Sequence, residues 1–257
     1  IDPVAESWEL SCHHDGQSII SNGEFSGKTL AQYIETVGKQ VIGTKAPKDK
    51  DFPILIKFID AKQSLSVQVH PDDKYALLHE GESGKTEMWY VMDATPDATL
   101  IYGFTHEISH HEFERRIKDN TLLEVCNQVP IKKGDVFFIE AGTLHAIGAG
   151  ALIAEIQQSS NSTYRVYDYG RVGKDGKLRE LHIEKALAVT KLEPPTRKPE
   201  PIAKLTAFAD YDLTILAQCE LFNVSHFDLH GNCSLNAKKD SFHSILVLDG
   251  QIALTYG

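Results

Sequence analysis

Three polar side chains alternate along one short stretch, residues 65–71, which reads Leu-Ser-Val-Gln-Val-His-Pro. Successive side chains leave a strand on opposite faces, so Ser66, Gln68 and His70 share one face and the apolar residues share the other. A hydroxyl, a carboxamide and an imidazole spaced in this way can bind one ion or one ligand together. An ordinary polar strand face explains these three residues equally well, so the choice depends on residues further along the chain.

Two of those residues complete a set of metal-binding groups. Glu87 opens an aromatic-rich predicted strand at residues 87–91, and His145 follows a glycine turn that delivers it onto a later strand. Two neutral imidazoles and a carboxylate form a common zinc set that leaves one position open for water or substrate. The same trio also suits iron(II) as a facial triad, and the sequence does not separate the two metals.

Each of these residues also has a purely structural interpretation. His145 alone suits a hydrogen-bonded histidine at the rim of a barrel, and Glu87 suits an ion pair with nearby Lys85. Arg165 stands among several tyrosines and charged residues, where it suits a structural link between strands. Only the whole constellation favours a site.

Three other patterns resemble known motifs but lack their context. Gly27-Lys-Thr and Gly84-Lys-Thr both lack the glycine that a phosphate loop needs five residues earlier. His106-Glu-Ile-Ser-His matches a zinc-protease pattern, which works only when both histidines lie on one helix. Because Ser109 and Glu112 form a predicted capping box, the helix should begin at Ser109 and leave His106 before it. We therefore predict neither a nucleotide loop nor a protease.

Composition narrows the class of protein. The 257 residues are 42% hydrophobic, and no apolar run approaches the roughly 20 residues that a membrane helix needs. The net charge of −10 disfavours nucleic-acid binding. The four cysteines are widely spaced without a CxxC pair, which favours reduced thiols in a cytoplasmic protein. The chain begins at Ile1 and stops within a predicted sheet, so we expect segments to be missing at both ends. The sequence does not indicate the oligomeric state.

Many short strands with glycine turns predict a β-sandwich or a small barrel. Four prolines between residues 193 and 201 predict a linker. Helices are expected at 28–37, at 71–79 with Pro71 in the first position, from Ser109 onward and at 179–190. Strands are expected at 8–12, 53–59, 65–71, 87–91, 99–104, 136–139, 151–158, 213–218, 222–229, 244–248 and 251–256, the last two joined by an Asp-Gly turn.

Four ordered motifs resemble those of the type I mannose-6-phosphate isomerases, most closely the short bacterial form. They are residues 66–72 (Ser-Val-Gln-Val-His-Pro-Asp), 84–89 (Gly-Lys-Thr-Glu-Met-Trp), 142–146 (Gly-Thr-Leu-His-Ala) and 160–165 (Ser-Asn-Ser-Thr-Tyr-Arg). Residues 134–145 also resemble the second cupin motif, with Ala141 where cupins usually have proline. The resemblance extends over about residues 8–190 and weakens beyond them.

This resemblance implies a mainly β fold: a cupin-type β-barrel or jelly roll with a few helices, followed by part of a second cupin-like barrel. It implies a metal-binding catalytic domain over residues 1–192 with helical insertions, a proline-rich linker over 193–203 and an incomplete second β domain over 204–257. It also implies a cytoplasmic enzyme with one zinc ion per chain that interconverts mannose 6-phosphate and fructose 6-phosphate.

The resemblance also assigns roles to particular residues. The metal positions are Gln68, His70, Glu87 and His145, the catalytic positions are Arg165, Lys85 and Glu155, and the substrate-binding positions are Ser66, Lys85 and Arg165. Two other classes stay open: an iron dioxygenase with the same ligands and a non-catalytic sugar-binding cupin. The two cations Lys85 and Arg165 favour a phosphorylated sugar, because a chain of net charge −10 needs local positive charge to bind an anion.

Overall fold

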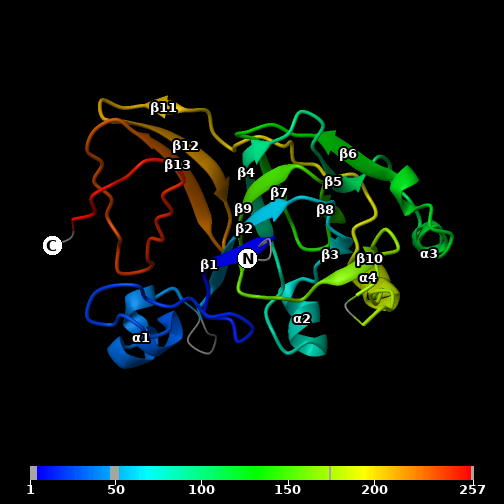
Figure 1. Cartoon of the computed structure of the whole chain (residues 1–257), viewed down its shortest axis with the longest axis horizontal. Coiled ribbons are helices and arrows are strands. Elements are labelled where there is room, and N and C mark those ends of the chain that lie inside the picture. Colours follow the sequence, from blue (N-terminus) through cyan, green and yellow to red (C-terminus); the bar gives the residue numbers. More distant parts are fainter. Residues whose placement is uncertain (1–4, 47–51, 174, 256–257) are drawn as a thin grey trace.

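The computed structural model describes residues 5–46, 52–173 and 175–255 and is mainly β (Figure 1). Two five-stranded antiparallel sheets carry most of the chain. The first has the order β1 (Glu6–Leu10), β2 (Ile54–Ala61), β9 (Ala151–Gln158), β4 (Glu87–Ala94) and β7 (Val136–Ile139). The second has the order β10 (Tyr164–Tyr167), β3 (Val67–Val69), β8 (His145–Ile147), β5 (Thr99–Phe104) and β6 (Cys126–Pro130).

One apolar core lies between these two sheets. Ile59, Val91 and Ile153 of the first sheet pack with Leu100 and Ile147 of the second, and all five are nearly or fully enclosed. Alternate residues along each strand supply this core, as period-two patterning requires. The expectation of a mainly β fold is confirmed. The described strands form separate sheets rather than one closed barrel, because no ladder joins the edges of the two sheets.

The opposite face of the first sheet is covered as well. Ile56, Met88 and Ile156 point away from the central core and pack on Leu216 and Phe222. These last two belong to the C-terminal part, whose three-stranded sheet has the order β11 (Thr206–Ala207), β12 (Tyr211–Gln218) and β13 (Asn223–Leu229) (Figure 1). The first sheet is therefore buried on both faces, which explains the nearly continuous apolar sequence of β2 and β9.

Local capping chemistry fixes where the helices begin. Thr29 and Gln32 form a reciprocal capping box for α1 (Leu30–Val37). Ser109 caps α3 (His110–Lys118), as expected. Asp72 caps α2 (Asp73–His79) by accepting from Tyr75 N, so Pro71 lies before the cap and the predicted first helical position is wrong. The described residues also form two 3₁₀ turns, Lys39–Ile42 and Leu122–Glu124.

The structure corrects two further predictions. Helix α4 covers only Ile183–Val189, because the backbone N of His182 donates to Arg165 O and holds the preceding segment against β10. Residues 244–248 and the described part of 251–256 form no strand, since no described neighbour offers them a ladder; residue 256 lies outside the described residues.

The proline-rich residues 193–203 contain no helix or strand and lie against the first part of the chain, where the Arg197 guanidinium stacks 4.0 Å from the ring centroid of Phe138. None of the described helices is both long enough and apolar enough to cross a membrane.

Candidate metal centre and active site

The inner face of the first sheet changes from apolar to charged along its length. Lys57, Glu155 and Trp89 are direct partners across β2, β9 and β4, so their side chains share one face. The neighbouring row pairs Gln157 with Glu87. These are positions where the strand pattern demands core residues, yet four of the five carry polar or charged groups and all five are buried. Such a cluster indicates a functional site rather than a packing need.

The second sheet presents a matching row. Arg165 of β10 pairs with Gln68 of β3, and Gln68 pairs with His145 of β8, so these three side chains also share a face. His70 follows β3 directly and keeps the same parity as Gln68. The alternation predicted for residues 65–71 is therefore confirmed, although the ladder itself is limited to Val67–Val69.

His70, Glu87 and His145 converge on one point from three different segments. The two imidazole Nε2 atoms lie 3.1 Å apart. Glu87 Oε2 lies 3.6 Å from His70 Nε2, and Glu87 Oε1 lies 3.4 Å from His145 Nε2. One potential ligand atom of each residue lies within 4.8 Å of the others, and all three side chains are almost completely buried.

Backbone carbonyls fix the tautomers of both histidines. His70 Nδ1 lies 2.8 Å from Ser162 O, and His145 Nδ1 lies 2.8 Å from Thr143 O. A carbonyl oxygen only accepts, so each Nδ1 carries the proton and each neutral ring presents a lone pair at Nε2. The two lone pairs face each other and the carboxylate of Glu87.

Such a concentration of acceptors favours a bound cation. Both oxygens of Glu87 are sealed from solvent and accept no aligned hydrogen bond from the described residues, although the ammonium of Lys85 lies 3.0 Å from Oε2. Buried acceptors of this kind are costly unless a donor or a metal ion satisfies them. Two imidazole nitrogens and one carboxylate match the donor preferences of zinc, and the carbonyls behind the imidazoles supply the usual outer support. The residues therefore fit a divalent metal ion.

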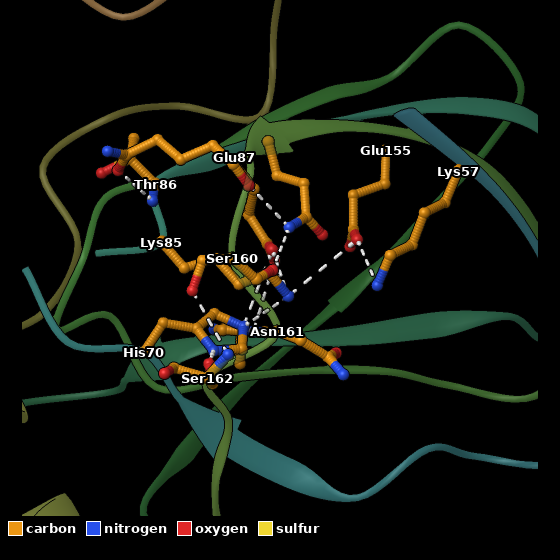
Figure 2. Close-up of polar contacts among 12 residues, drawn as sticks. Lys57, His70, Lys85, Thr86, Glu87, Glu155, Ser160, Asn161 and Ser162 are labelled. Atoms are coloured by element: carbon orange, nitrogen blue, oxygen red, sulfur yellow. Dashed lines mark hydrogen bonds and ion pairs between the residues drawn. The ribbon is translucent and has the colours of Figure 1, made fainter. Parts of the chain in front are cut away.

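Lys85 adds a positive charge beside this trio. Its Nζ lies 3.0 Å from Glu87 Oε2, 3.2 Å from His70 Nε2 and 4.0 Å from Glu155 Oε1. Glu155 in turn lies 3.7 Å from Lys57 Nζ. Figure 2 shows this alternation, with Lys57 pointing at Glu155 and Lys85 directed toward His70 and Glu87. The charges of the two lysines and the two carboxylates cancel, which makes their joint burial tolerable.

Burial shifts the protonation of the ligand candidates. It lowers the pKa of His145 to about 4, and it lowers the pKa of His70 well below its usual range, with Lys85 and His145 acting in the same direction. Both imidazoles are therefore neutral, as metal ligands must be. Burial, together with the charge of Glu155, raises the pKa of Glu87 to about 7 despite the opposing effect of Lys85.

Glu155 is held in the ionised form. Burial alone would raise its pKa, but Lys85, Lys57 and a hydrogen bond from Trp89 together lower it. Trp89 Nε1 donates to Glu155 Oε2 at 2.8 Å, while Oε1 accepts no hydrogen bond from the described residues. This leaves one carboxylate oxygen of the buried cluster with an unused lone pair.

The remaining expected residues lie on or beside the strand row that carries His145. Gln68 is partly exposed beside His145, and Ser66 is buried next to the start of β3. Arg165 is partly buried; its Nη1 donates to Glu180 O at 3.0 Å, and its buried Nε finds no acceptor among the described residues.

Three residues of this cluster were not predicted from the sequence: Lys57, Trp89 and Gln157. Lys57 carried a signal, because it is the single charge inside the apolar run 53–59. Trp89 and Gln157 carried none, since an aromatic residue and a glutamine are ordinary in strands.

The rejected motifs also have clear positions. His106 precedes helix α3 and is exposed, so the His106-Glu-Ile-Ser-His pattern does not form a zinc-protease helix. Gly84-Lys-Thr stands at the entry to β4, where the backbone of Gly84 lies against that of Asp72 and Asp73. Its glycine is required by this close approach, since an added Cβ would lie 2.4 Å from Asp72 C.

Comparison with known proteins gives the same picture. Residues 1–100 match the model of the phosphomannose isomerase type I catalytic domain. Mannose-6-phosphate isomerase ManA of Bacillus subtilis is 40% identical over 249 residues, covering 96% of this chain and 77% of the relative. Mannose-6-phosphate isomerase of Streptococcus mutans is 38% identical over 258 residues, covering 100% and 78%.

A solved structure agrees at the level of fold. The crystal structure of the mannose 6-phosphate isomerase from Bacillus subtilis superposes with a TM-score of 0.80 at 36% identity, covering 88% of this chain and 70% of that one. With a buried His-Glu-His cluster and relatives of this similarity over more than two thirds of their length, the chain belongs to the type I phosphomannose isomerase family.

Proposed function

We propose that this chain is a mannose-6-phosphate isomerase, which interconverts mannose 6-phosphate and fructose 6-phosphate with one zinc ion held by His70, Glu87 and His145. The observation that carries the proposal is the convergence of these three buried side chains, whose nitrogen and oxygen lone pairs face one another. Gln68 lies on the same face beside His145 and is the candidate for a fourth ligand. A divalent ion bound there supplies Lewis acidity toward a sugar oxygen.

The isomerisation moves a proton between two adjacent carbons of the sugar through an enediol. It needs a base that takes the proton from one carbon and returns it to the other. Glu155 suits this role because it is ionised and because its Oε1 has no hydrogen-bond partner, while Trp89 fixes its other oxygen. Lys85, 4.0 Å away, moderates the charge of this carboxylate.

Positive charge near the pocket suits an anionic substrate. Arg165 lies on the inner face of the second sheet beside Gln68, and it is partly exposed. A guanidinium there would stabilise the phosphate or the charge that develops on the sugar oxygen. Ser66, which directly precedes β3, adds a buried hydroxyl on the same face as Gln68. Lys85 is buried against the metal ligands, so its contribution is to the field inside the pocket rather than to an exposed phosphate.

The state of the cysteines supports a cytoplasmic location. The four cysteines are free thiols, which suits the reducing cytoplasm where hexose phosphates occur. We also propose a catalytic part over residues 1–192, a linker over 193–203 and a second, cupin-like part from 204 onward. The four prolines between residues 193 and 201 support this division.

A coupled assay tests the proposal. Purified protein should form fructose 6-phosphate from mannose 6-phosphate, and a chelator should abolish the activity until zinc is restored. Elemental analysis should find about one zinc per chain. Metal-replete protein that leaves mannose 6-phosphate unchanged would refute the assignment. Oxygen consumption with iron(II) would instead favour a dioxygenase, and sugar binding without turnover would favour a binding cupin.

A further inference from the structure

Glu82 lies outside the set of residues discussed so far, in the loop between α2 and β4. Its Oε1 accepts hydrogen bonds from Ser160 Oγ, at 3.2 Å, and from Ser162 Oγ. Its Oε2 accepts from the backbone N of Asn161 at 3.5 Å and lies 3.3 Å from His13 Nε2. A single carboxylate thus binds three successive residues of one segment, 78 to 80 positions away in the sequence.

That segment supports the metal centre. Residues 160–163 form neither helix nor strand, so no ladder fixes their carbonyl groups. The Ser162 carbonyl nevertheless accepts the proton of His70 Nδ1 at 2.8 Å, and Figure 2 shows Ser160 and Ser162 beside His70. The direction of this one carbonyl determines the tautomer and the tilt of the His70 ring.

The carboxylate is itself anchored from the other side. The backbone N of Asp15 donates to His13 Nδ1 at 3.2 Å, so His13 carries its proton on Nε2 and donates it to Glu82. The His13 side chain is 6% exposed and that of Glu82 is 25% exposed, which shields the contact from competition by water. The resulting chain of contacts runs from His13 through Glu82 and Ser162 to His70.

We propose that Glu82 is a positioning residue for the metal centre. By fixing the Ser162 carbonyl it holds the imidazole of His70 with the proton on Nδ1 and the lone pair on Nε2, and so it sets the affinity of the centre for a divalent ion. This inference rests on the proposed function, because that function places the ion at His70, Glu87 and His145. Neither the sequence motifs nor the metal-ligand set includes Glu82.

Zinc affinity of metal-stripped, full-length protein tests the proposal. The matched control is Glu80→Ala, because Glu80 lies two residues earlier and binds Tyr164 Oη and Lys185 Nζ, both at 2.7 Å, without contacting residues 160–162. Competition with a chromophoric chelator should show Glu82→Ala binding zinc about 10- to 100-fold more weakly than the wild type. Glu80→Ala should retain the wild-type zinc affinity. Glu82→Gln should lose less zinc affinity than Glu82→Ala, since its amide oxygen still accepts hydrogen bonds from the hydroxyls of Ser160 and Ser162.

The visible absorption of cobalt(II)-substituted protein provides a readout that a general loss of stability would not produce. Its bands should shift in Glu82→Ala and stay unchanged in Glu80→Ala, because only the first alters the geometry of His70. If Glu82→Ala does not fold, Ser162→Ala replaces it and should weaken zinc binding several-fold. Wild-type affinity and spectrum in Glu82→Ala, or in Ser162→Ala where that is used, would overturn the inference and leave the isomerase proposal intact. A wild-type chain that binds no zinc would overturn both.

Discussion

The ammonium of Lys85 lies 3.0 Å from Glu87 Oε2, and both side chains are buried. The same nitrogen lies 3.2 Å from His70 Nε2, so Lys85 contacts two of the three ligand candidates. This position has two opposite consequences. Lys85 neutralises Glu87 in the metal-free fold, and it repels a dication placed among the same atoms.

Lys85→Met should therefore separate stability from metal affinity. Without the ammonium, Glu87 loses its buried counter-charge, and we expect the free energy of unfolding of the metal-free protein to fall by about 3 kcal/mol. Zinc should bind the variant about tenfold or more tightly, because the like charge is gone. Urea denaturation with and without zinc measures both effects. Lys57→Met, which loses its contact with Glu155 at 3.7 Å, is the control and should leave zinc affinity nearly unchanged.

The depressed pKa of His145 predicts how stability depends on pH. The folded chain keeps this imidazole neutral down to about pH 4, whereas the unfolded chain protonates it near 6.5. The unfolded state therefore binds more protons between these values, so stability is fully present above pH 6.5 and is lost as the pH falls toward 4. Relative to His145→Gln, the metal-free wild type should lose on the order of 3 kcal/mol between pH 7 and pH 4.

Urea titrations of both proteins at several pH values measure this difference. The raised pKa of Glu87 acts in the opposite direction, with stability lost as the pH rises from 4.5 through about 7, and the comparison with His145→Gln largely removes it. Parallel pH curves for the two proteins would show that His145 is protonated equally in both states.

Part of the geometry of the three candidate metal ligands could be predicted from the sequence, because strand periodicity determines which side chains share a face. The alternation of residues 65–71 predicted that Gln68 and His70 share one face. The strand expected at 87–91 was predicted to begin with Glu87, and the structure places that strand, β4, in the other sheet. What brings His145 to them is the ladder between β3 and β8, in which Gln68 is its direct partner. A pattern within one strand predicts the face, and ordered motifs indicate which strands belong together.

Other features depend on contacts that no local pattern encodes. Residues 244–248 form an apolar run of the kind found in strands but have no described partner to pair with, so the backbone stays irregular. Arg179 was expected to open a helix, yet its guanidinium binds Asp168, and the helix starts only at Ile183. The role of Glu82 arises from bonds to residues about 80 positions away, which only the folded chain brings together.

Arg165→Ala should impair activity far more than folding. Among the described residues the side chain makes one hydrogen bond, to Glu180 O, at a partly exposed position, so its loss should cost about 1 kcal/mol or less. If the guanidinium stabilises charge on the substrate, kcat/KM should fall about 100-fold or more. Thermal unfolding and the coupled assay measure the two effects. Arg179→Ala is the control, because Arg179 pairs with buried Asp168 and should affect stability more than turnover. An Arg165→Ala chain that unfolds would identify this arginine as structural.

Trp89→Phe should change the pH profile of the reaction as well as its rate. The indole Nε1 donates to Glu155 Oε2 at 2.8 Å and helps keep the pKa of this carboxyl low. Phenylalanine retains an apolar ring but no donor, so the pKa of Glu155 should rise and a smaller fraction of it should be ionised at low pH. We expect the acidic limb of the kcat/KM profile to move to higher pH and the rate at neutral pH to fall about tenfold.

Met88→Leu provides the matched control for this change. Met88 is equally buried and is the neighbour of Trp89 in β4, but it points to the other face, into the core shared with Leu216 and Phe222. A volume-conserving change there should cost less than about 1.5 kcal/mol and leave the acidic limb in place. Because both variants disturb the packing of one strand, only a shift confined to Trp89→Phe assigns the effect to the lost hydrogen bond. Equal profiles in the two variants would exclude Glu155 as the group whose ionisation limits the rate.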